Sequence, residues 1–258
     1  IASHPIIKNV ITSAKKNLNK YNNPDEVAEY IKFPCIKTHE IVYETGPAAF
    51  TMAIFQSANQ DGNINDITIN SGGFLTIMRN SSSSLTVANN FTNNGTVTLN
   101  SDADEFATII VQGSSTGDIV YNRYTNTVGS GEWDLIGAPV DGLSISSFVS
   151  TNSTPLATSG SIYAVGTYDN SNDTWTNYTT SSVGAAGNFD IGKGYQMATT
   201  SGATMAFTGT VATSDQTQSI INNAGNGGRR WNLVANPFPS YLNANDNADG
   251  TNNFLKVN

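Results

Sequence analysis

Oxygen-bearing side chains near the C-terminus match the first half of a calcium-binding loop. Asn245, Asn247, Asp249 and Gly250 stand at positions 1, 3, 5 and 6 of that pattern. Calcium takes several oxygen ligands from a sharply turned loop, and these residues could supply them. Position 12 carries Lys256, where the pattern places a bidentate Glu. Two interpretations stay open, a calcium site or a solvated polar loop.

Three aromatic residues form a second group that could bind a ligand. Tyr168, Trp175 and Tyr178 flank the loop 170–173, whose Asn, Ser and Asp residues predict a hairpin. Flat rings on an exposed hairpin can stack on sugar faces, so we take the three as candidates for glycan contact. The alternative, which the usual burial of tryptophan favours, is that Trp175 packs into the core.

Other reactive side chains favour structural roles. Cys35 and His39 lie four residues apart, but no third group is visible to orient them for nucleophilic chemistry. The acidic run 102–105, which reads DADE, is typical of a solvated turn. From residue 51 onward the chain has no His and no Cys, which removes the commonest general base and soft metal ligands. We therefore expect no catalytic residue in this region and a chain that is not an enzyme.

A seven-residue motif occurs twice and predicts the architecture. WDLIGAP at Trp133–Pro139 recurs 98 residues later as WNLVANP at Trp231–Pro237. Repetition at a domain-sized distance indicates two related β-units. Alternation along each motif predicts a strand, and each closing proline lacks the N–H that would continue it. We predict that both tryptophans are buried in equivalent strands.

The stretch 51–125 reads as a region of short strands. Its strand cores begin at positions 67, 75, 85 and 97, which are 8, 10 and 12 residues apart, and a further core covers 108–111. Such spacing suits a meander in a sandwich or a small parallel β-solenoid. Asn93-Asn94-Gly95 predicts a tight hairpin, which favours antiparallel pairing locally.

The stretch 126–258 has longer strands with more aromatic residues and reads as a β-sandwich-like region. The expected strands are SIYAVGTYD, TWTNYTT, GKGYQMATT, ATMAFTGTV and RRWNLVANP. The predicted fold class is thus mainly β, with an additional short α-rich segment at the N-terminus.

Residues 1–50 differ in character from the rest. They carry six of the twelve basic residues and five acids, or +1, whereas the remainder carries −9. Ile7, Ile11 and Leu18 recur at helical spacing, and Asn23 followed by Pro24 is typical of a helix start. We predict a separate α-rich folding unit for this segment.

Composition excludes several classes of function. The formal net charge of the 258 residues is −8, which disfavours nucleic acid and anionic lipid as partners. One cysteine permits no internal disulfide bond, and no apolar run approaches the roughly 20 residues of a membrane-spanning helix. The first residues carry neither a starting methionine nor a signal peptide, which fits a processed or excised piece of a longer protein.

Three stretches carry a resemblance to a group of exported proteins. They are RWNLVANPFPS at residues 230–240, LTVANNFTNNGTVTL at 85–99 and GDIVYNRYTN at 117–126. Over roughly residues 60–250 the chain resembles β-rich regions of large exported proteins of the Bacteroidota, many of them sent out by type IX secretion. The resemblance implies an extracellular or outer-surface location. It carries over no catalytic residue, and the usual C-terminal sorting domain is absent.

The expected function is therefore a non-catalytic β-domain for adhesion or display, in contact with surface glycans or other cell-surface proteins. One alternative is an accessory or spacer module of a secreted polysaccharide-degrading enzyme. The other is a β-solenoid lyase or hydrolase, which needs acidic and basic side chains on one sheet face. The sequence offers Arg79, Arg123 and scattered Asp for that role. No cofactor is implied, apart from the candidate calcium ion.

Overall fold

The computed structural model describes residues 54–58, 64–79, 84–129, 132–222 and 231–242. These residues form a mainly β structure with three sheets and one α-helix, which confirms the predicted fold class. No helix among them is long and apolar enough to cross a membrane. The predictions for residues 1–50, including Cys35 and His39, and for the candidate calcium ligands Asn245, Asn247 and Asp249 lie outside the described residues.

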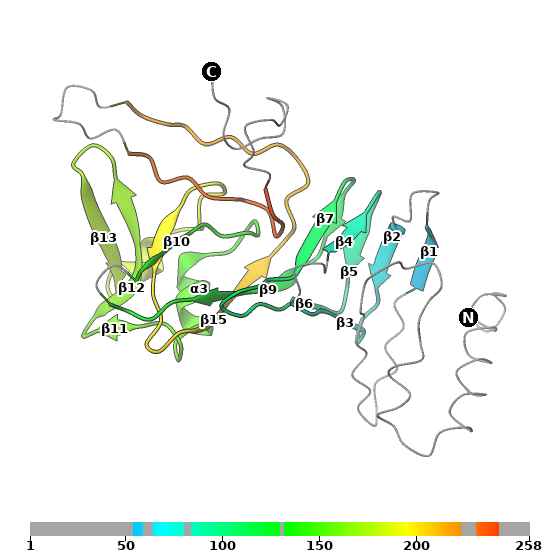
Figure 1. Cartoon of the computed structure of the whole chain (residues 1–258), viewed down its shortest axis with the longest axis horizontal. Coiled ribbons are helices and arrows are strands. Elements are labelled where there is room, and N and C mark those ends of the chain that lie inside the picture. Colours follow the sequence, from blue (N-terminus) through cyan, green and yellow to red (C-terminus); the bar gives the residue numbers. More distant parts are fainter. Residues whose placement is uncertain (1–53, 59–63, 80–83, 130–131, 223–230, 243–258) are drawn as a thin grey trace, which may run out of the picture.

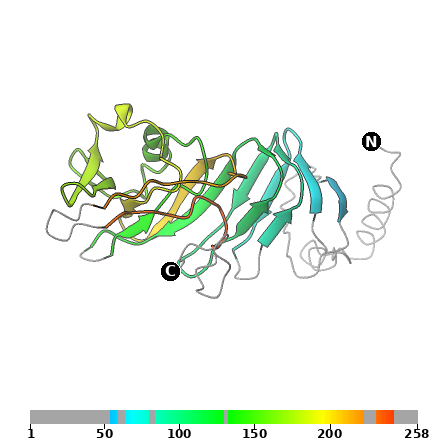
Figure 2. The same cartoon turned by 90° about the horizontal axis from the view of Figure 1, so that it is seen from above.

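Short strands in the first half stack as three rungs of a parallel β-solenoid (Figures 1 and 2). Each rung contributes to two sheets. The first sheet contains β1 (Ile54–Ala58), β2 (Ile64–Ile69), β4 (Ser84–Val87), β5 (Phe91–Asn93), β7 (Thr108–Val111) and β8 (Ser115–Thr116). The second contains β3 (Phe74–Ile77), β6 (Thr96–Leu99), β9 (Ile119–Thr125) and β15 (Ala203–Gly209). β1 pairs antiparallel with β2, and β15 pairs antiparallel with β9.

The register of the stack explains why the strands are apolar at alternate positions. Ile67 lies beside Phe91, and Leu75 lies beside Val97, so buried residues form continuous columns inside the solenoid. The sequence left a meander and a solenoid open, and the parallel pairing selects the solenoid. Each strand pairs with the strand one rung further along the chain and not with the next strand in sequence. The spacings of 8 to 12 residues between strand cores therefore hide a repeat of 22 to 24 residues.

The predicted hairpin at Asn93-Asn94-Gly95 is wrong. β5 and β6 belong to different sheets, and the three residues form the corner between them. The Asn93 side chain accepts a hydrogen bond from the Gly95 N–H at 2.9 Å, which shapes the corner locally. A Cβ at Gly95 would collide with the Gly73 carbonyl oxygen of the preceding rung. Glycine is needed here because the backbones of two rungs approach closely, and not because the chain reverses direction in a hairpin.

Polar side chains at another corner connect all three rungs. The Asp66 carboxylate accepts hydrogen bonds from the backbone and side-chain N–H groups of Asn90, at 3.1 and 3.0 Å. Ser114 donates to the Asn90 side chain at 2.6 Å. Each partner lies 24 residues further along the chain, so this ladder repeats the period of the apolar columns.

Between β9 and β15 the chain forms a five-stranded antiparallel sheet. Its strands are β10 (Asp134–Ile136), β11 (Thr158–Ser159), β12 (Ile162–Asp169), β13 (Thr174–Thr179) and β14 (Tyr195–Met197). The helix α3 (Ile145–Thr151) and the 3-10 turn η1 (Val183–Ala185) lie between these strands in sequence. The predicted strands are thus confirmed, except that residues 231–237 form a single bridge at Val234 and no strand.

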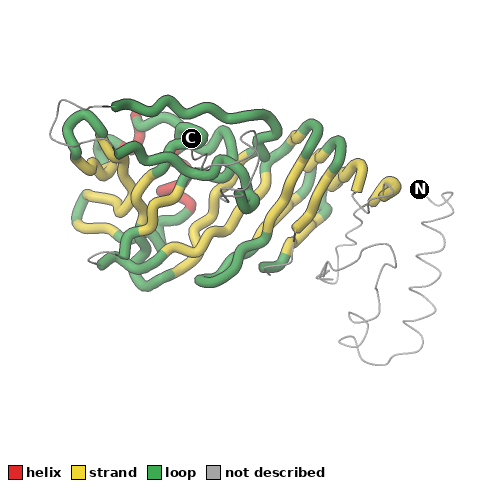
Figure 3. The backbone as a smooth tube through the Cα atoms, turned by 45° about the horizontal axis from the view of Figure 1, so that its top comes forward, coloured by secondary structure: helices red, strands yellow, loops and turns green. Residues whose placement is uncertain are grey.

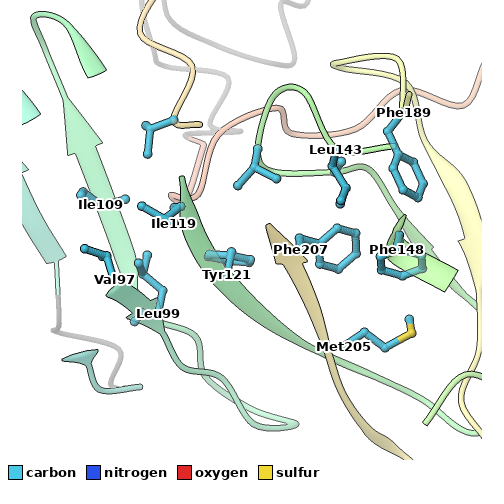
Figure 4. Close-up of a cluster of buried hydrophobic side chains, with 14 of the residues drawn as sticks. Val97, Leu99, Ile109, Ile119, Tyr121, Leu143, Phe148, Phe189, Met205 and Phe207 are labelled. Carbon is cyan, nitrogen blue, oxygen red and sulfur yellow. The ribbon is translucent and has the colours of Figure 1, made fainter. Parts of the chain in front are cut away.

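One apolar core continues from the solenoid into the antiparallel half (Figure 4). Phe148 on α3 lies 5.2 Å from Phe189 and 4.8 Å from Phe207 between ring centres. Asn152, which ends the helix, is buried and bonds through its side chain to the backbone of Ala206 on β15. The helix is thereby fixed against the second sheet. The predicted domain boundary near residue 125 stays a prediction.

Candidate functional site

The hairpin of β12 and β13 exposes an aromatic pair. Tyr168 and Trp175 face each other in the strand register, with ring centres 5.1 Å apart and planes inclined at 50°. Trp175 is 44% exposed. The expectation that Trp175 packs into the core is therefore wrong. Thr174, Trp175 and Thr176 are all exposed, so this end of β13 lies away from the core.

Side chains of the turn hold this hairpin in shape. The Asp169 carboxylate accepts hydrogen bonds from the Ser171 hydroxyl and backbone N–H, and from the Asn172 amide. These bonds favour the ionised form and lower the pKa of Asp169. Tyr168 donates through its hydroxyl to Asp173 at 2.8 Å, and Asp173 adopts a φ of 58°. The aromatic pair is thus held on a bonded turn rather than on a loose loop.

Tyr178 does not join this pair. It lies three residues after Trp175 on the same strand, so alternation places it on the opposite face. There it is partly buried and packs against the core. Burial, with a smaller effect of Asp190, raises the pKa of Tyr178. Of the three predicted glycan contacts, the structure brings together two.

The first copy of the repeated motif follows the prediction in part, because only Asp134–Ile136 form the strand and Trp133 precedes it. β10 pairs with β14, with Asp134 opposite Met197 and Ile136 opposite Tyr195. Trp133 is partly buried and packs against the core, and Pro139 is buried beyond the end of the strand. The strand already ends at Ile136, so the proline lies outside it and its missing N–H interrupts no ladder.

The prediction of an equivalent second copy is wrong. Trp231 is 76% exposed and lies in no strand, although Pro237 is buried like Pro139. Two backbone bonds attach this copy to the chain before β14, from the Gly194 N–H to the Leu233 carbonyl at 3.0 Å and from the Ala235 N–H to the Gly192 carbonyl at 2.9 Å. The segment therefore crosses the sheet end as an irregular chain (Figure 3), which leaves its first residue in solvent.

The two copies touch each other at equivalent positions. Gly137 and Ala235 are both fifth in the motif, and a Cβ on Gly137 would lie 2.5 Å from the Ala235 Cβ. The Leu233 side chain similarly fills the space over Gly194. The repeat therefore builds one contact between its copies instead of two separate units.

A pocket opens where the two copies meet the last rung of the solenoid. We call it the junction pocket, and its volume is about 390 Å3. Its lining residues come from three parts of the chain: Phe106, Tyr121 and Arg123 from the solenoid end, Leu135, Ile136, Gly137 and Pro139 from the first copy, and Val234, Ala235, Asn236, Phe238, Ser240, Tyr241 and Leu242 from the C-terminal segment. The Pro239 carbonyl also accepts a bond from the Ile109 N–H of β7 at 2.8 Å, which fixes that segment to the rungs.

Sequence reasoning named Arg123 only for a solenoid lyase or hydrolase and missed its place in a pocket, although the signal is visible. Along β9 the positions 119, 121 and 125 are buried and alternate with half-buried ones, so Arg123 stands in the core-facing series. Its strand partner, Met205, is fully buried. A charge in an apolar series is unusual unless it has a partner or a function.

The acidic run at 102–105 is a turn, as the sequence predicts. Asp102 accepts backbone hydrogen bonds from Asp104 at 3.0 Å and Glu105 at 2.9 Å, and it also pairs with Arg79. The backbone bonds from Glu105 and Asp104 are the main cause of its lowered pKa. Among the described residues, no group of three or more His, Cys, Asp or Glu side chains could hold a metal ion.

Comparison with known proteins assigns a family. No curated protein and no solved structure matches the chain. The model of one family, described as "Domain of unknown function (DUF8693)", matches residues 21–257. Because that match covers most of the sequence, the chain belongs to the DUF8693 family.

Proposed function

We propose that this protein is a non-catalytic β-domain of the outer cell surface or extracellular space that contacts glycans through the Tyr168–Trp175 face of its hairpin. The observation that carries the proposal is the exposed indole of Trp175, held opposite Tyr168 on two paired strands. A sugar ring has an apolar face that a flat aromatic side chain can cover. Strands hold such a side chain at little entropic cost, because its rotamers are already restricted.

The composition of the surface supports the same proposal. Ser, Thr and Asn are abundant and only 12% of residues are charged. Hydroxyl and amide groups both donate and accept hydrogen bonds, as sugar hydroxyls require of a partner. In the solenoid, Thr68, Thr92 and Thr116 lie in register along one outward column, which extends this neutral polar surface over all three rungs.

The carboxylates on the solenoid favour a binding domain over a solenoid lyase or hydrolase. The Asp66 carboxylate accepts hydrogen bonds from Asn90. The Asp102 carboxylate accepts hydrogen bonds from the backbone of its own turn and forms an ion pair with Arg79. A general acid needs a raised pKa, whereas the pKa of Asp102 is lowered. Each of these carboxylates thus already has a structural role.

The test is glycan binding by the purified chain, first on an array and then by affinity electrophoresis in gels that contain the best polysaccharide. We expect Trp175→Ala to weaken binding at least about tenfold, or about 1.4 kcal/mol. The matched control is Phe74→Ala, which removes a ring that is 49% exposed on the solenoid strand β3.

Equal losses in the two variants would contradict the assigned face. Release of reducing ends or unsaturated products from any polysaccharide would contradict the non-catalytic role, provided that replacing a single carboxylate abolishes it.

A further inference from the structure

The junction pocket has a chemistry that the hairpin lacks. Neither Tyr168 nor Trp175 lines it, and its only ionisable lining groups among the described residues are Arg123 and two tyrosines. No lining residue is acidic, although the chain as a whole carries a net charge of −8. A volume of about 390 Å3 is within the range of small-molecule sites.

Arg123 brings a positive charge to this pocket, and none of the described residues forms an ion pair with it. The ion pairs of the described residues are Arg79 with Asp102 and Lys193 with Asp190, and Arg123 takes part in neither. Its guanidinium lies 4.4 Å from the centre of the Phe106 ring. A guanidinium held over a ring keeps its N–H groups in a planar fork, which matches the two oxygens of a carboxylate.

The Tyr121 hydroxyl provides a second donor beside Arg123. Burial raises the pKa of Tyr121, and the nearby Arg123 charge opposes this only in part. The phenol therefore stays protonated throughout the physiological range and can donate a hydrogen bond to an anion. Two donors and no lining carboxylate favour a negatively charged ligand group.

The remaining walls favour a flat or apolar body on that ligand. Phe106 and Tyr241 stack with ring centres 4.1 Å apart and planes inclined at 27°. Leu135, Pro139 and Val234 complete the apolar lining. An inorganic anion would leave these walls without a contact, whereas a ring that carries a carboxylate would use both parts of the pocket.

We propose that the junction pocket binds a carboxylate carried on a ring, with the carboxylate on Arg123 and the ring against Tyr241 and the apolar wall of Leu135, Pro139 and Val234, because Phe106 is already covered by Tyr241 and Arg123. The ring comes from an acidic sugar or from an aromatic acid, because both carry a carboxylate beside a ring with an apolar face. This site gives the two copies of the motif a common role, which is to form a wall of the pocket. The two copies meet at Gly137 and Ala235 and together form one side of the pocket.

The test is isothermal titration calorimetry of the complete chain with digalacturonate and with benzoate. Each is compared with its uncharged counterpart, the methyl ester of digalacturonate and benzamide. We expect at least one carboxylate to bind, its counterpart to bind at least about tenfold more weakly, and high salt to weaken the carboxylate alone. Binding of digalacturonate alone identifies a sugar acid, and binding of benzoate alone identifies an aromatic acid.

Arg123→Met keeps an unbranched apolar stem and removes the guanidinium with its charge. We expect it to weaken carboxylate binding at least about tenfold. Arg79→Gln removes an arginine outside the pocket and should have no effect, and Trp175→Ala should also leave this binding unchanged. Leu135→Glu is a second variant, because Leu135 is 56% exposed and a carboxylate there should repel the ligand without disturbing the fold. If Arg123→Met loses its cooperative melting transition, the carboxylate affinity of Leu135→Glu tests the proposal in its place.

The proposal is overturned if neither carboxylate binds, if benzamide or the ester binds as tightly as the acid, or if the pocket variants bind like the wild type. These results are independent of glycan binding at the hairpin, which Trp175→Ala reports separately.

Discussion

Equivalent positions have similar surroundings in the rungs of the solenoid but different surroundings in the two copies of the repeated motif. In the solenoid, residues one rung apart share their surroundings: Ile67 and Phe91 are both buried, and Asp66 and Asn90 bond to each other at one corner. The two copies of the motif are much more alike in sequence, yet Trp133 is partly buried and Trp231 is 76% exposed. Stacking imposes equal environments on unlike residues, whereas like residues differ when one copy forms a strand and the other does not.

The largest effect should come from a core position in the stack. Phe91→Ala removes a ring with no exposed surface and should lower the free energy of unfolding by about 3–5 kcal/mol. Urea denaturation measures the change. Phe74→Ala, on a neighbouring rung but half exposed, is the control and should stay within about 0.5 kcal/mol of wild type. Similar losses in both variants would mean that the rungs do not enclose a core.

The next largest effect is the difference in stability loss between the variants of the two motif tryptophans. Trp133→Ala removes a partly buried ring that packs on the core and should cost about 2–3 kcal/mol. Trp231→Ala removes an indole in solvent and should change stability by less than about 0.5 kcal/mol. Thermal melts of the two variants, side by side, give the difference. Equal losses would restore the equivalence of the copies.

A smaller effect should come from the contact between the copies. Gly137→Ala places a methyl group against Ala235 and should cost about 1–2 kcal/mol, because the two Cβ atoms would lie 2.5 Å apart. Ala235→Gly in the same chain should recover part of that loss, because the new methyl group would still lie 2.8 Å from the Lys193 carbonyl oxygen. A double-mutant cycle on denaturant unfolding measures the coupling. Additive losses would show that the two motifs do not meet at these positions.

The smallest effect concerns the hairpin turn and its pH dependence. The pKa of Asp169 is lowered below its ordinary value of 3.8, so the unfolded chain binds the proton more tightly than the folded one. Its stabilising contribution is therefore complete above about pH 4 and is lost as the pH falls below that value. The protection factors of the β13 amides should fall in acid more for the wild type than for Asp169→Asn. An identical acid response of both proteins would exclude Asp169 as the origin.

The alternation of apolar and polar residues predicts most of the strands. It fails where a residue distant in sequence determines how the strands pair or why a glycine is needed. The strand cores and the 170–173 hairpin were predicted from alternation and turn residues, and the structure confirms them. Alternation is the same in parallel and antiparallel strands, so it left the solenoid and the meander undecided. At Asn93-Asn94-Gly95 the turn residues were recognised but the reason was not, because the demand for glycine comes from Gly73 on another rung.

The candidate site shows the same limit. The exposure of Trp175 depends on which part of its sheet the core covers, and the sequence does not contain that information in a local form. The Trp231 error has a similar cause, since the chain before β14 determines how the second motif lies. Arg123 was different, because its place in the core-facing series of β9 could have been noticed from Ile119, Tyr121 and Thr125 alone.

The reversed strands β1 and β15 have a consequence for the length of the stack. Parallel rungs present open edges whose N–H and C=O groups can template a further strand, which is how stacked β-structures grow into fibres. β1 reverses direction on the first sheet at β2, and β15 does so on the second sheet at β9. A further parallel rung cannot add at either of these edges, because an antiparallel strand already satisfies the ladder there. Direction reversal thus stops parallel stacking at the β2 and β9 edges, whereas β3, β7 and β8 still end their sheets without a reversed strand.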